Sequence, residues 1–129
     1  MASLLRRMGI CEERGSGVDK VVSLTELHQL PAPVFKAMEH ATRATLFGPR
    51  AFGDMDRADR ILACYLHACL RYVNGSPMTN SSLRKRFGID KASSATVSRI
   101  ISSAQDAGRI KPYDWLQGRK FAKYLPFWA

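Results

Sequence analysis

Residues 56–129 place three helical patterns in succession and then two extended segments, an order that few folds accommodate. The predicted helices cover residues 56–73, 79–88 and 91–107, and the extended segments cover 109–113 and 119–128. Thr79 is a good N-cap for the second helix, and Gly88 breaks it. The loop 114–118 joins the two extended segments. Three helices followed by a β-hairpin predict an α+β domain with a winged helix-turn-helix fold.

The third predicted helix consists mostly of small side chains. Residues 91–108 read KASSATVSRIISSAQDAG, and the apolar positions Val97, Ile100, Ile101 and Ala104 recur at helical spacing. The opposite face carries Ser, Ala, Thr and a single Arg. A helix in a major groove ~12 Å wide must let its backbone approach closely, which long side chains would prevent. We therefore expect this helix to contact duplex DNA, and an ordinary amphipathic helix of a soluble domain is the open alternative.

Candidate DNA-contacting residues come first from the N-terminal part of that helix, where such contacts concentrate. They are Ser94, Ala95, Thr96, Ser98, Arg99 and Ser102. Arg99 is the candidate for a bidentate contact to guanine or to a phosphate. Basic residues on both sides of the helix add a phosphate clamp and a charged wing, namely Arg84, Lys85, Arg86, Arg119, Lys120 and Lys123. Trp115, in the loop of the hairpin, could stack on a base or sugar or pack against a partner domain.

The positive charge is concentrated in the same half of the chain. The formal net charge is +9. Residues 1–55 hold 7 Lys and Arg against 6 Asp and Glu, whereas residues 56–129 hold 13 against 5. A basic bias confined to one region is the footprint expected of a protein that binds a polyanion. Charge alone therefore favours nucleic acid over solubility as the explanation.

The sequence predicts two parts. Residues 1–50 are expected to be the C-terminal fragment of a larger domain whose body lies upstream, and residues 51–129 are expected to be the winged helix domain. The N-terminal part contains a predicted helix from about Gly17 to His28 and a predicted strand from Arg43 to Phe47. No partner strand is evident, and a single strand cannot satisfy its own ladder of hydrogen bonds, so either it pairs elsewhere in this chain or its sheet is missing. The segment FGPRAFGDMD, with two Gly and one Pro, has the composition of a linker.

Two segments, CEERGSGVDKVV and TRATLF, followed by the basic winged helix, resemble the C-terminal portion of a family of bacterial helicase-related transcriptional regulators. In that family a Schlafen/AlbA-type DNA-binding domain precedes a GHKL-type ATPase-like module and a winged helix. The resemblance implies that Gly15 and Gly17 belong to a glycine box that approaches phosphates. It implies ATP and Mg²⁺ binding only in the full-length protein, because the module's Mg-coordinating Asn and adenine-contacting Asp belong to an upstream helix. A simple helix-entry turn is the alternative for these glycines.

Other function classes have weaker support in the sequence. We find no nucleophile–base pair, no paired carboxylates and no metal-ligand set, so we expect no enzyme, no metal and no cofactor in this chain. Three cysteines without a CxxC motif, and no signal peptide, predict a cytoplasmic protein without membrane contact. The expected partners are double-stranded DNA and the upstream domain of the same protein. Two alternatives are left open by the sequence. The protein could form a homodimer, and the winged helix could bind another protein without affinity for DNA.

Overall fold

The computed structural model describes residues 16–129, which form an α+β structure with four α-helices and two small antiparallel sheets. The helices are α2 (Ser16–Leu27), α3 (Arg57–Val73), α4 (Asn80–Phe87) and α5 (Ser94–Asp106), with 3-10 turns η1 (Phe52–Asp54) and η2 (Lys91–Ser93). The strands are β1 (Val34–Ala37), β2 (Thr42–Thr45), β3 (Met78–Thr79), β4 (Ile110–Pro112) and β5 (Lys123–Pro126). Within these residues, no helix is both long enough and apolar enough to cross a membrane.

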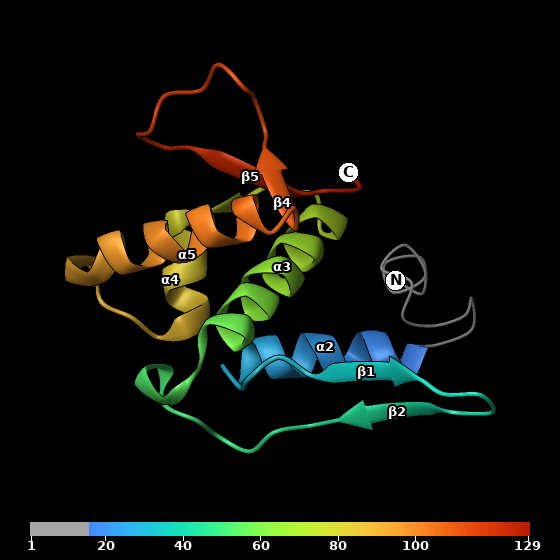
Figure 1. Ribbon diagram of the computed structural model, residues 1–129. Coiled ribbons are helices and arrows are strands. Elements are labelled where there is room, and N and C mark those ends of the chain that lie inside the picture. The colour runs from blue at the N-terminus through green and yellow to red at the C-terminus, as the bar shows by residue number, and fades with distance from the viewer. Residues whose placement is uncertain (1–15) are drawn as a thin grey trace.

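Helix α3 is the central element of the structure. It runs diagonally through the middle of Figure 1, with α5 and the β4–β5 pair on one side and α2 with the β1–β2 hairpin on the other. All residues from Ala63 to Leu70 are buried, because neighbours cover the helix on several sides. Asp56 caps its first turn, since its side chain accepts a hydrogen bond from the Asp59 backbone N–H at 2.8 Å. The predicted helix over 56–73 is confirmed.

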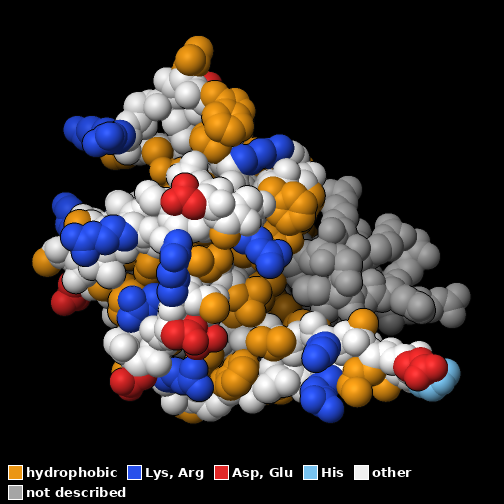
Figure 2. Space-filling model, viewed as in Figure 1, with side chains coloured by type: hydrophobic (Ala, Val, Ile, Leu, Met, Phe, Trp, Pro, Cys, Tyr) orange, Lys and Arg blue, Asp and Glu red, His pale blue; other side chains and the backbone are white. Residues whose placement is uncertain are grey.

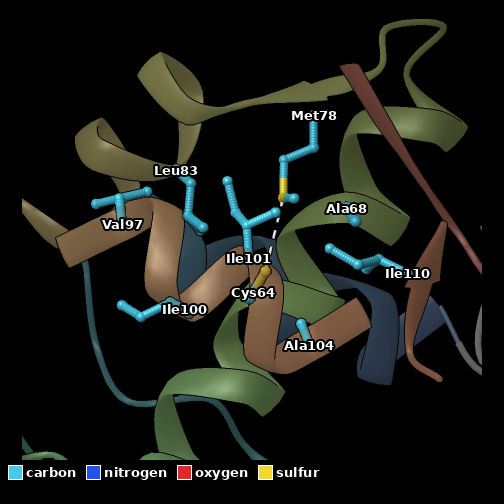
Figure 3. Close-up of a cluster of buried hydrophobic side chains, with 9 residues drawn as sticks. All are labelled: Cys64, Ala68, Met78, Leu83, Val97, Ile100, Ile101, Ala104 and Ile110. Atoms are coloured by element: carbon cyan, nitrogen blue, oxygen red, sulfur yellow. Dashed lines mark hydrogen bonds between the residues drawn. The ribbon is translucent and has the colours of Figure 1, made fainter. Parts of the chain in front are cut away.

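One apolar cluster holds α3, α4 and α5 together. Figure 3 shows its side chains converging from these helices and from β3 and β4. Leu83, Val97 and Ala104 are fully buried, and Ile101 is nearly so. The predicted inner face of the helix in residues 91–107 is therefore confirmed, although η2 replaces its first turn.

A second cluster joins the N-terminal part of the chain to the rest. Val22 of α2 and Ala32 pack with Leu66 and Leu70 of α3 in one buried group. At the other end of the chain, Trp128 folds back on the same helix, where its Nε1 donates to the Tyr65 hydroxyl at 3.2 Å. The segments on both sides of the predicted boundary at residue 50 thus share a core.

The sheet beside the helices has the order β3–β5–β4, and the sequence did not reveal its third strand. Strand β3 is only two residues long and pairs Met78 with Tyr124. The predicted cap at Thr79 is confirmed, and Ser82 completes a capping box. The second extended segment is shorter than predicted. The Gln117 side chain contacts the start of β5, since its Nε2 donates to the Lys123 carbonyl and its Oε1 accepts from the Lys123 N–H, both at 2.9 Å.

The predicted strand near residue 43 pairs with another strand of this chain, so its sheet is not missing. Strand β2 pairs in antiparallel register with β1, from Val34 opposite Thr45 to Ala37 opposite Thr42. The turn closes with the Met38 N–H donating to the Ala41 carbonyl at 2.7 Å. The segment before this turn follows LPAP and lacks a run of β-branched residues, so its strand character comes from the pairing.

The buried thiols and phenols predict a loss of stability at alkaline pH. Burial raises the pKa of the Cys69 thiol from 9.0 to about 12, and it also raises the pKa of Cys64, Tyr65 and Tyr124. The unfolded chain releases these protons at their ordinary pKa values while the folded chain retains them, so stability is full below pH ~9 and falls above it. One pH unit above its ordinary value, each thiol is expected to cost about 1.4 kcal/mol.

Urea unfolding at about pH 8 and about pH 10 measures this effect. A Cys64→Ala/Cys69→Ala variant is the control and should lose less stability between the two pH values. Equal losses in this variant and the parent would contradict the assignment to the thiols.

Candidate nucleic-acid interface

Helix α5 presents a narrow polar face to solvent. Its side chains at Ser94, Ala95, Ser98, Arg99 and Ser102 are exposed, and Thr96 is half-buried. Each lies opposite or beside the buried apolar stripe, because the 3.6-residue period separates the two sets. Ala95, Arg99 and Ser102 therefore lie on the outer face of the helix. Ser94 and Ser98 lie on one flank of that face, and Thr96 lies on the other.

Asn80, at the start of α4, links that helix to α5 and was missed in the sequence. Its Nδ2 donates to the Ser98 Oγ at 3.0 Å and to the Ser94 carbonyl at 3.1 Å. Its Oδ1 accepts from the Arg84 Nε at 3.0 Å. This chain of hydrogen bonds fixes a guanidinium beside the outer face of α5. The signal available in the sequence was only an Asn next to the cap Thr79.

The three consecutive basic residues of α4 point in different directions. Arg84 is tied toward α5, whereas Lys85 is exposed and lines a cavity formed with α2 and α3. Arg86 is 5% exposed, and its Nε donates to the Glu26 Oε1 at 2.6 Å. The placement of Arg86 in an exposed phosphate clamp is therefore wrong, because successive helical residues are rotated by about 100° and this one faces the core.

Glu26 joins three helices through a buried polar network. Its Oε2 lies 2.8 Å from the His67 Nδ1, and the His67 Nε2 lies 3.0 Å from the Ser82 Oγ. Arg86 also donates to the Leu30 carbonyl. The network lines a cavity of about 580 Å³ between α2, α3 and α4.

The order Ser82, His67, Glu26 is formally that of a nucleophile, base and carboxylate. Ser82 is already committed to the capping box, since its Oγ lies 3.0 Å from both the N–H and the C=O of Thr79. Arg86 occupies the other oxygen of Glu26. These contacts describe a structural link between helices.

A second cavity, of about 210 Å³, lies between α3 and α5. Its lining includes Arg57 and Arg60 from α3 and Thr96, Arg99 and Ser103 from α5. The two arginines of α3 were not among the residues predicted from the sequence. Their position in the first turns of a helix, where cations are unfavourable, was the available signal.

Figure 2 shows how charge is distributed around these elements. Lys and Arg side chains spread over the left and centre of this face, where α5 and the first turns of α3 lie, with a few Asp and Glu among them. The predicted wing residues Arg119, Lys120 and Lys123 are exposed around the loop between β4 and β5. That loop also carries apolar side chains, with Trp115 79% and Leu116 93% exposed.

Only one glycine of the predicted glycine box lies within the described residues. Gly15 lies outside the described residues. Gly17 is the second residue of α2, and a Cβ atom added there would meet nothing within 4 Å. The space beside Gly17 is therefore open, and no contact among the described residues assigns it to a phosphate.

One family model matches the chain. Residues 1–46 match the family described as "Putative ATP-dependent DNA helicase recG C-terminal". No curated protein and no solved structure matches the chain. The match supports a helicase-related, ATPase-like fragment in the N-terminal part, and the Schlafen/AlbA-type context stays a prediction.

Proposed function

We propose that residues 51–129 form a winged helix-turn-helix that binds double-stranded DNA in a sequence-specific manner. In this proposal α5 lies in the major groove, and the loop between β4 and β5 is the wing that contacts the backbone beside it. The full protein would be a bacterial transcriptional regulator in which a helicase-related segment precedes this domain.

The proposal rests on the outer face of α5, which consists mostly of small side chains. Five of its candidate residues are exposed, and only Arg99 among them has a long side chain. The order of elements from α3 to β5, with the sheet β3–β5–β4, is that expected of a winged helix. A backbone that small side chains leave accessible can approach base edges, and hydroxyls can bond phosphates or bases.

The surrounding charge supports a polyanionic partner. Arg84 is held beside α5 through Asn80, and Arg57 and Arg60 lie on its other side. Lys120 adds charge in the wing. Contacts from these elements to several phosphates would release counterions, so affinity would depend steeply on salt.

Fluorescence anisotropy with a labelled duplex pool is the test. We expect binding at about 50 mM salt that weakens by roughly 10³-fold or more by about 200 mM, if six or more phosphates are contacted. Arg99→Ala should relax sequence preference, as read by selection from randomised duplexes, whereas Lys120→Ala should weaken all sequences alike. Arg43→Ala, in the β1–β2 hairpin away from α5, is the charge-matched control. Absence of binding at micromolar protein and low salt would contradict the proposal.

Docking of a protein partner or dimerisation is the second candidate, because one surface favours it. The loop between β4 and β5 exposes Trp115, Leu116 and Phe121 by 79%, 93% and 83%. Exposed aromatic and aliphatic side chains of this size are typical of interface anchors. A mass that rises with concentration in analytical ultracentrifugation, together with no affinity for DNA, would favour this function.

A further inference from the structure

Three arginines surround the cavity between α3 and α5 without a counter-ion from the described residues. Arg57, Arg60 and Arg99 line it, and none of them makes an ion pair within residues 16–129. The two neighbouring acids are occupied. Asp56 caps α3, and Asp59 pairs with Arg50 at 3.0 Å. Three cations that share one small cavity repel one another, and an anion between them would remove that repulsion.

Arg60 is held in place before any ligand arrives. Its guanidinium carbon lies 4.1 Å from the centroid of the Phe52 ring, and its Nη2 donates to the Phe52 carbonyl at 2.9 Å. Its buried Nε has no hydrogen-bond partner among the described residues. A guanidinium has five N–H donors, so most of those on this side chain stay unused. An ordered arginine with spare donors is suited to a tetrahedral oxyanion.

The remaining lining favours the same ligand. The hydroxyls of Thr96 and Ser103 can donate to oxyanion oxygens, and the α3 N-terminus adds a partial positive charge. The cavity volume of about 210 Å³ is large enough for a phosphate group.

The geometry points to a phosphate-binding site centred on Arg57 and Arg60, with Arg99, the proposed base-contacting residue, lining its outer edge. Resting on the proposed function, we assign it to one phosphate of the duplex backbone that flanks α5, because Arg99 belongs both to the cavity and to the outer face of the helix, which Thr96 flanks. The same chemistry would accept free inorganic phosphate, and the experiment separates these two sources.

The test compares Arg57→Ala/Arg60→Gln with the parent and with Arg43→Ala, which removes an exposed cation from β2. In duplex titrations, the double variant is expected to lose roughly tenfold or more in affinity for all sequences and to reduce the salt slope by about 1. Inorganic phosphate is titrated separately, with the arginine Nε–Hε signals as the NMR readout. Circular dichroism confirms that both variants are folded.

The outcomes distinguish this site from the proposed function. Weaker duplex binding by the double variant, with Arg43→Ala unchanged, supports a backbone phosphate. Phosphate-induced shifts in the parent that vanish in the double variant, without duplex affinity, support the site for free phosphate and reject DNA binding. Duplex affinity equal in the parent and the double variant, with no response to phosphate, overturns the site and leaves the proposed function standing.

Discussion

Arg86→Ala is expected to lower the free energy of unfolding by about 3–5 kcal/mol. The side chain is 2% exposed, and its removal leaves the Glu26 carboxylate, which is 12% exposed, without its guanidinium partner. The Leu30 carbonyl loses a donor at the same time. A domain of this size is stable by only about 5–15 kcal/mol, so the loss is a large share of the total.

Urea unfolding followed by circular dichroism measures that change. Lys85→Ala, one residue earlier in α4, is the matched control because its side chain is exposed, and its effect should be small. Glu26→Leu/Arg86→Met removes both charges and should recover much of the loss. If Arg86→Ala and Lys85→Ala destabilise equally, the buried network does not hold α2 to α4.

Leu83→Ala is expected to cost about 2–5 kcal/mol. Leu83 is fully buried in the cluster that it shares with Met78, Val97 and Ile101. Shortening it leaves a cavity between α4 and α5, and the neighbouring helices can close it only in part. Because α5 has its main apolar support there, we expect weaker duplex binding at temperatures near the midpoint of unfolding.

Ser81→Ala is the control in the same helix, since Ser81 is exposed. The urea midpoints of the two variants are compared, and the slope m of each unfolding transition is measured as well. A change in m would indicate that the substitution altered the unfolded state. A loss below about 1 kcal/mol for Leu83→Ala would mean that the site repacks, and the cluster would then not position α5.

The helices were predictable because their signals are local. Apolar residues at helical spacing defined α3 and α5, and Thr79 with Gly88 defined both ends of α4. These signals depend on backbone propensity and on burial of one face. The outer face of α5 followed from the same period, so its candidate residues could be named in advance.

The pairing of β3 with β5 and the ion pair of Arg86 with Glu26 were not predictable, because each joins segments that are distant in the sequence. Strand β3 has two residues, too few for a β-strand pattern, and exists through its pairing with β5. The inward direction of Arg86 depends on Glu26, 60 residues earlier in the chain.

The shared cluster of Val22, Ala32, Leu66 and Leu70 restricts how the chain can be divided for experiments. A truncated protein starting after the linker at residue 50 would expose Leu66 and Leu70 of α3 to solvent. It would also leave the Arg86 guanidinium without the Glu26 carboxylate that it pairs with. Such a fragment would be prone to aggregation, and its poor behaviour would say nothing about DNA. Any shortened version should therefore begin ahead of α2, at or before Ser16.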